Sequence, residues 1–271
     1  MSARNNKANK AAARERLRQE REAQAKKDKT RRQLIVVGST IAVLAVAGGI
    51  SYGVIQSNEP DHWESVSKEK TVTAPKNSDG TNGTNVVIGK PEAKKTLELY
   101  EDARCPSCAK FEQGVGETIK KDLAAGKYKV KFVGATFIDN MDQGEGSKNA
   151  LSAMGAALNV SPEAFSDFKA ALYSKEFHPT ESKDDFAKDS YLLKVADSVP
   201  ALKGNAEFKK NVEDGTYDAW AMKMSGAFDK SGVGSTPTLK VDGKKVVVEG
   251  TDTPPSTATE FNTAMDRALK G

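Results

Sequence analysis

The stretch that decides the fold is Arg104-Cys105-Pro106-Ser107-Cys108-Ala109-Lys110, which contains both cysteines of the 271-residue chain. Residues 96–100 (TLELY) precede it as a predicted strand, and residues 109–124 follow as a predicted helix. Two cysteines separated by two residues at a strand-to-helix junction are typical of a thiol–disulfide redox site, because the helix N-terminus stabilises a thiolate. Pro106 falls in the first helical turn, where its missing N–H costs nothing. We therefore take the cysteine pair as the candidate active site.

The two cysteines are expected to differ in role. If Cys105 begins the helix, its sulfur faces backbone N–H groups that have no helical partner, which favours the nucleophilic thiolate. Cys108 lies three residues later on the same helical face and can close a disulfide with Cys105. Arg104 favours the thiolate, whereas Glu101 and Asp102 oppose it. The sign of this local electrostatic balance stays open at the level of sequence.

Three other uses of the cysteine pair are alternatives to redox chemistry. A structural disulfide is one, but a two-residue spacer closes a loop too small to gain much chain entropy. A zinc site would need four ligands, and beyond the cysteines the chain offers only His62 and His178, both of which we expect at the surface. Two unrelated free thiols are a third alternative, which an exported protein with both cysteines in one motif does not favour.

The N-terminal residues 1–33 form a basic segment that we expect in the cytoplasm. Within it, residues 1–32 contain 12 Lys and Arg against four acidic residues, a net charge of +8, while the whole chain carries +4. The remaining residues are therefore acidic overall. The basic character belongs to the short segment, so the composition gives no indication of nucleic-acid binding by the folded part.

Residues 34–55 predict a single transmembrane helix. No charged side chain occurs between Arg32 and Glu59, and 34–55 as a helix would reach about 33 Å, enough to cross a bilayer core. The basic segment precedes it, so the positive-inside rule predicts a single-pass protein of the cell membrane with an extracytoplasmic catalytic domain. A cleaved signal with Ala45-Val46-Ala47 as its site, or a twin-arginine signal at Arg31, stays open. Each alternative exports the folded part.

The rest of the chain predicts a polar linker at residues 56–84 and an α/β domain at 85–271. The domain starts in the order strand, strand, helix, strand, and a helical block follows at about 142–230. Strands return afterwards, joined at Asp242-Gly243 by a strong hairpin signal. The predicted strands are 85–89, 96–100, 128–136, 238–241 and 244–249, and the predicted helices are 109–124, 147–158, 165–173, 183–198, 207–228 and one that opens at 254–256.

Residues 97–112 (LELYEDARCPSCAKFE) and 232–244 (GVGSTPTLKVDGK) together resemble the DsbA-like branch of the thioredoxin superfamily. The resemblance covers about residues 79–271 and is closest to the membrane-anchored, exported forms of Gram-positive bacteria. It implies a thioredoxin fold with an inserted helical domain. It also implies that a redox-active disulfide, with no bound cofactor or metal, carries the chemistry.

The same resemblance implies roles for individual residues. Cys105 corresponds to the exposed nucleophile and Cys108 to the buried resolving thiol. Thr236-Pro237 corresponds to the cis-proline loop, which faces the disulfide and binds peptide through its backbone. The residues expected to contact substrate are Pro106, Ser107, Thr236 and Pro237.

The activity implied is the oxidation of thiols in secreted or cell-surface proteins. The substrates would be thiol-containing exported proteins, and a DsbB-like or vitamin K epoxide reductase-like membrane protein would reoxidise the enzyme. An extracytoplasmic reductase or isomerase, and a thioredoxin-fold chaperone, remain as alternatives.

Two features depart from the family pattern. Ser107 stands where the best-studied oxidases have a histidine that stabilises the thiolate, which leaves the direction of electron flow open. The family often places a buried acid before the first cysteine, but that position is Leu99 here. Glu98 and Glu101 are weak substitutes by spacing, so no proton shuttle is predicted.

Overall fold

The computed structural model describes residues 61–180 and 182–270 of the chain. Their centre is a five-stranded sheet in the order β1-β3-β2-β4-β5, in which β2 and β3 pair in parallel and the other neighbours pair antiparallel. The predicted α/β class is therefore confirmed. The strands are β1 (Val86–Ile88), β2 (Thr96–Asp102), β3 (Lys129–Ala135), β4 (Thr238–Val241) and β5 (Lys244–Lys245).

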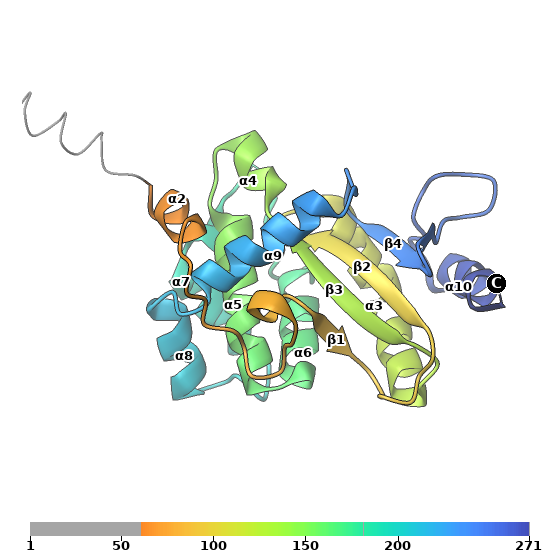
Figure 1. Ribbon diagram of the computed structural model, residues 1–271, viewed down its shortest axis with the longest axis horizontal. Helices are drawn as coiled ribbons and strands as arrows, with labels where there is room; N and C mark the ends of the chain where they lie inside the picture. The colour runs from red at the N-terminus through yellow and green to blue at the C-terminus, as the bar shows by residue number, and fades with distance from the viewer. Residues whose placement is uncertain (1–60, 181, 271) are drawn as a thin grey trace, which may run out of the picture. The chain divides into compact units, whose positions relative to one another are not determined.

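Helices cover both faces of this sheet. Figure 1 shows α9 in front of β3, α3 behind the sheet, and α5, α6 and α8 gathered toward the β1 side. The helices between β3 and β4 begin at Phe137 and end at Lys230. The helices are α2 (His62–Ser67), α3 (Pro106–Ala125), α4 (Phe137–Asp142), α5 (Gly146–Val160), α6 (Pro162–Leu172), α7 (Asp189–Ala196), α8 (Ala206–Glu213), α9 (Asp218–Lys230) and α10 (Ala258–Lys270), with 3₁₀ turns η1 (Thr81–Gly83) and η2 (Asp185–Ala187).

Packing against the sheet holds α3, the helix that carries the cysteines. Pro106 occupies its first turn, and Gly126 ends it in the left-handed conformation (φ 73°), which glycine adopts at little cost. A buried cluster joins α3 to β2 and α10, and Phe111 meets Phe261 edge to face with ring centroids 6.3 Å apart. The cluster includes Leu97, Leu99, Phe111, Val115, Ile119, Phe261 and Met265.

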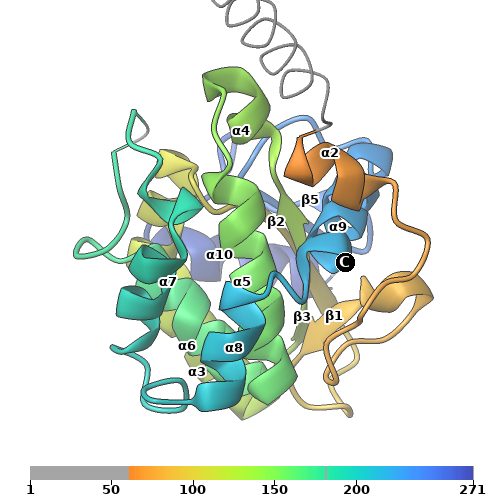
Figure 2. The same ribbon diagram turned by 90° about the vertical axis from the view of Figure 1, so that its left-hand side faces the viewer.

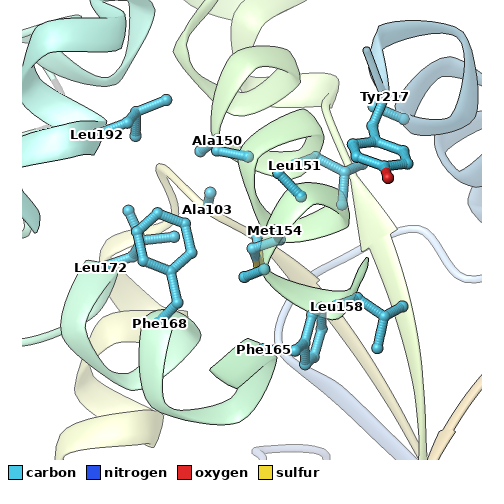
Figure 3. Close-up of a cluster of buried hydrophobic side chains, with 14 of the residues drawn as sticks. Ala103, Ala150, Leu151, Met154, Leu158, Phe165, Phe168, Leu172, Leu192 and Tyr217 are labelled. Atoms are coloured by element: carbon cyan, nitrogen blue, oxygen red, sulfur yellow. The ribbon is translucent and has the colours of Figure 1, made fainter. Parts of the chain in front are cut away.

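The helical block has α5 at its middle, flanked by α6, α7 and α8 (Figure 2). Small residues allow close approach: a Cβ on Gly155 would lie 2.8 Å from the Trp220 ring. Leu151, Met154 and Leu158 of α5 point among side chains from the neighbouring helices (Figure 3). The apolar stripes of α6 and α9 are both buried in the core; they comprise Phe165, Phe168, Leu172, Trp220, Met224 and Phe228.

Several predicted elements have different limits in the structure. The helix expected at 207–228 is two helices, α8 and α9, because the chain turns at Gly215 with a φ of +61°. The strand expected at 244–249 ends at Lys245. The Asp242-Gly243 hairpin forms as predicted, with both residues at positive φ (50° and 78°), the values of a type I′ turn.

The segment predicted as a linker differs most. From Asp61 onward it belongs to the folded unit, and α2 buries Trp63 and Val66. Downstream, the Trp220 indole donates a hydrogen bond to the Gly83 carbonyl (2.8 Å) and the Asn77 amide donates one to the Leu158 carbonyl (2.7 Å). The sequence predicted a linker because the segment is polar and turn-rich, and only two apolar side chains of α2, Trp63 and Val66, are buried.

Within residues 61–180 and 182–270, every helix is too short or too polar to span a bilayer. The predicted membrane segment at 34–55 and the basic segment at 1–33 lie outside the described residues. Both therefore stay predictions.

Replacing Trp63 with alanine tests whether residues 61–84 stabilise the fold. Because Trp63 is 6% exposed, Trp63→Ala should lower the free energy of unfolding by about 3 kcal/mol. Urea denaturation measures it, and Val87→Ala, at a side chain 36% exposed, is the control. An unchanged midpoint for Trp63→Ala would show that the segment adds no stability.

Candidate active site

The two cysteines lie at the start of α3 as free thiols. Cys105 is the N-cap residue, with extended backbone (φ −70°, ψ 117°), and Cys108 lies in the first helical turn. The Cys105 backbone N–H donates to the Asp102 carbonyl (3.0 Å), which ties the motif to the end of β2. Cys105 is 7% exposed and Cys108 is fully buried. Cys105 is therefore more accessible than Cys108, but less exposed than the resemblance implied.

In the structure, the Thr236-Pro237 motif lies against the cysteine motif. The Thr236–Pro237 peptide bond is cis, and the Cys105 thiol donates to the Thr236 carbonyl over 3.5 Å. Pro237 is buried at the start of β4, whereas Pro106 and Ser107 are exposed beside the cysteines. The four residues expected to contact substrate therefore lie around Cys105.

The pKa values of the two thiols move in opposite directions. The pKa of Cys105 is lowered to about 6, chiefly by a hydrogen bond from the Cys108 thiol, with Thr236 and the backbone N–H groups of Cys108 and Ser107 adding to it against burial. Burial and the hydrogen bond to Cys105 raise the pKa of Cys108 well above its ordinary value. Near neutral pH, Cys105 is therefore a thiolate and Cys108 is a protonated thiol.

A buried ion cluster lies next to the thiols. Glu101 is 1% exposed and accepts a hydrogen bond from the Lys169 ammonium (3.0 Å), which also donates to Glu112 (2.5 Å). Burial raises the pKa of Glu101 to about 7, against the attraction of Lys169. The charge of Glu101 in turn contributes to the raised pKa of Cys108. Glu101 is therefore a buried acid with a raised pKa whose charge acts on Cys108.

Glu101 is a buried acid beside the cysteines, although its spacing made it only a weak substitute for the family's buried acid. Strand alternation puts Glu101 on one face of β2, with Leu97 and Leu99, and its neighbours Tyr100 and Asp102 on the other. Tyr100, Glu101 and Asp102 are all buried at the end of β2, since helices cover both faces of the sheet. The missing signal was tertiary: Lys169, the partner of Glu101, lies 68 positions away along the chain.

Arg104 acts elsewhere than predicted. Its guanidinium, 3% exposed, forms ion pairs with Asp139 (2.9 Å) and Asp184 (3.3 Å). These carboxylates accept hydrogen bonds from backbone N–H groups at the start of α5, including those of Ser147 and Gly146. Arg104 thus joins the cysteine motif to the N-terminus of α5.

Asp102 fixes the same junction from the strand side. Its buried carboxylate accepts hydrogen bonds from the Ser147 hydroxyl (2.6 Å) and from the backbone N–H groups of Arg104 (3.0 Å) and Ile138 (3.2 Å). Burial raises the pKa of Asp102 to about 6, against these hydrogen bonds.

Neither histidine joins the cysteines as a zinc site would require. His62 pairs with Asp218 over 2.7 Å, and its side chain is 61% exposed. His178 is half-buried, contrary to prediction, with its ring stacked on Tyr173. In the described part of the chain, three or more potential metal ligands nowhere gather.

Comparison with known proteins assigns the family. The family described as "Thioredoxin" matches residues 81–267, most of the described part. The chain belongs to the thioredoxin family. The predicted thioredoxin-like fold is confirmed, together with the likeness to its DsbA branch.

Similar proteins of this family are thiol–disulfide oxidoreductases, which confirms the predicted class of enzyme. Disulfide bond formation protein D of Bacillus subtilis is 29% identical over 160 residues, covering 59% of this chain and 68% of that protein. The crystal structure of oxidised BdbD from Bacillus subtilis superposes with a TM-score of 0.56 at 26% identity, covering 73% of this chain and 99% of that one. Oxidised DsbA of Mycobacterium tuberculosis shares the fold, with a TM-score of 0.53 at 24% identity over 69% of this chain and 98% of that one.

The rate of Cys105 alkylation should depend on pH with a midpoint of about 6. The thiolate is the reactive form, so the rate with iodoacetamide should rise between pH 5 and 7. Thr236→Val removes a hydroxyl that stabilises the thiolate and should move the midpoint upward, whereas Thr263→Val, at an exposed position of α10, should not. A midpoint near 8.5, the ordinary value for a thiol, would contradict the electrostatics described.

Proposed function

We propose that this chain is an exported, membrane-anchored oxidase that forms disulfides in secreted or cell-surface proteins through a Cys105–Cys108 redox pair. One observation carries the proposal: Cys105 lies at the start of α3 against the cis Thr236–Pro237 bond, where hydrogen bonds lower its pKa to about 6. A stable thiolate favours the reduced state of the pair, and this makes the disulfide a stronger oxidant. The lowered pKa stabilises the reduced fold fully above the ordinary thiol value, and this stabilisation is lost as pH falls through about 6.

The reaction begins with a substrate thiolate attacking the Cys105 sulfur of the disulfide. A bond forms between the substrate sulfur and Cys105, the Cys105–Cys108 bond breaks, and its electron pair leaves on Cys108. A second substrate thiolate then attacks the substrate sulfur and releases Cys105 as a thiolate. The substrate loses two electrons and the enzyme pair gains them.

Glu101 supplies the proton that Cys108 needs when it leaves. Cys108 is a poor thiolate, since burial raises its pKa, and it must be neutralised inside the protein. The Glu101 carboxyl is buried beside it, with a pKa of about 7, so near neutral pH a large fraction carries a proton. In the reverse reaction the Glu101 carboxylate takes the proton back.

The N-terminal sequence supports the proposed location. We place residues 1–33 in the cytoplasm, 34–55 in the membrane and the catalytic unit outside, where disulfides persist. The substrates would be thiol-containing exported proteins, and a DsbB-like or vitamin K epoxide reductase-like membrane protein would accept the electrons. The disulfide itself would serve in place of a cofactor.

Cysteine variants and the redox potential test this function. Cys105→Ser should abolish oxidation of a reduced substrate protein, and Cys108→Ala should accumulate a mixed disulfide at Cys105. The potential, measured against glutathione, should lie nearer −120 mV, typical of an oxidase, than about −270 mV, typical of thioredoxin. An active Cys105→Ser variant would refute the mechanism, and a potential near −270 mV would make the protein a reductant.

Glu101→Gln should slow the reduction of the disulfide by about 10-fold or more at pH 7, because the leaving Cys108 loses its acid. Glutamine keeps the shape and can still accept from Lys169. Glu98→Gln, on the same strand with a side chain 28% exposed, is the matched control. Equal rates for Glu101→Gln and wild type across pH 5 to 9 would exclude the proposed proton transfer.

A further inference from the structure

Two buried polar atoms beside the cysteines lack a hydrogen-bond partner in the described residues: Glu101 Oε1 and the Tyr173 hydroxyl. An unpaired polar atom in the interior costs stability, so both call for a functional reason. Glu101 has a role in the proposed mechanism. Tyr173 has none so far, and its hydroxyl is a donor without an acceptor.

Tyr173 packs directly with the redox pair. It follows the last residue of α6, is fully buried, and shares a small apolar cluster with Cys105, Cys108 and Ile138 that is separate from the two large cores. The Tyr173 side chain therefore packs beside the buried Cys108 thiol.

Contacts on several sides fix the position of Tyr173. The Gln113 amide of α3 donates to its carbonyl (2.7 Å), the His178 ring stacks on it with centroids 5.9 Å apart, and the Lys169 ammonium lies 5.3 Å from the ring centroid. Side chains held in this way lose little freedom when they act, which suits a preorganised donor.

We propose that the Tyr173 hydroxyl donates a hydrogen bond to the Cys108 sulfur as the Cys105–Cys108 bond breaks. This inference rests on the proposed function, since it concerns the leaving thiolate of that reaction. The electron pair of the broken bond collects on Cys108, where the Tyr173 hydroxyl, packed in the same cluster and without a hydrogen-bond partner among the described residues of the reduced protein, stabilises the developing charge. Tyr173 keeps its own proton throughout, and the proton that neutralises Cys108 comes from Glu101.

The groups around Tyr173 keep its hydroxyl protonated, so that it can donate a hydrogen bond without ionising. Burial, followed by the charges of Glu101 and Cys108, raises the pKa of Tyr173 well above its ordinary value. The titratable groups on the elements packed around it are Glu101 and Asp102 of β2, Cys105, Cys108 and Glu112 at α3, Lys169 of α6, and His178 after α6.

Tyr173→Phe tests the proposal because it removes the hydroxyl and keeps the ring. The measurement is the rate at which dithiothreitol reduces the Cys105–Cys108 disulfide, followed by acid quench and alkylation between pH 6 and 9. The rate should fall about 10-fold at every pH, as expected for one lost transition-state hydrogen bond. Reoxidation by oxidised dithiothreitol should fall by the same factor, because both directions share one transition state, so the redox potential should not change.

Two further readouts separate this role from a structural one. The Cys105 alkylation midpoint should stay at about 6, and the stability of the reduced protein should be equal or higher, since the lost hydroxyl had no partner. Tyr128→Phe is the matched control: its buried hydroxyl bonds Asp122 at the far end of α3, so it should lower stability and leave the exchange rates unchanged.

Equal exchange rates for Tyr173→Phe and wild type would overturn the inference and leave the proposed function intact. A slower rate accompanied by a changed potential or a shifted Cys105 midpoint would also overturn it, because the hydroxyl would then act on the stable states. A wild-type protein that exchanges no disulfide with dithiothreitol would instead refute the proposed function.

Discussion

The site depends on placing the Cys105 sulfur at the N-terminus of α3 while the Cys108 sulfur is buried in the protein. Cys105 meets backbone N–H groups only because α3 begins at Pro106, and α3 stays in place because its apolar face packs between β2 and α10. Since the same turn carries Cys108 inward, one helix start produces both an accessible thiolate and a buried thiol. The opposite pKa shifts follow from this placement, because donors surround one sulfur and burial dominates at the other.

Sealing Cys108 requires cover on both faces of the sheet, and the helical block provides part of it. Lys169 of α6 pairs with Glu101, and Tyr173, one turn later at the end of that helix, packs on the cysteines. An unpaired carboxylate in this position would be costly, and Lys169 offsets that cost. The helical block is therefore part of the candidate active site as well as a covering layer. Asp102 binds the Ser147 hydroxyl at the start of α5, and Arg104 reaches the same helix start through Asp139.

Sequence alone predicted the features that depend on local chemistry. The strand-to-helix position of the cysteines and the Asp242-Gly243 hairpin follow from spacing and residue type, and the structure has both. The features it missed depend on contacts between distant segments. Glu101 was expected to be a weak candidate because the family's position for a buried acid falls at Leu99, and its partner Lys169 lies 68 positions away along the chain. Residues 56–84 were expected to be a linker because they are polar and turn-rich, but from Asp61 onward they belong to the folded unit, where α2 packs on α9.

Ser107 appeared to weaken the case for an oxidase, because the best-studied relatives have a histidine there. In the structure, the Cys105 pKa is lowered without a contribution from the Ser107 side chain among the causes named. Ser107 is exposed, and it lowers the Cys105 pKa through its backbone N–H, a group that every residue except proline provides. The other contributions come from Cys108 and Thr236. A histidine at this position would add to the stabilisation that the helix start already gives the Cys105 thiolate, so its absence does not by itself argue against the proposed oxidase function.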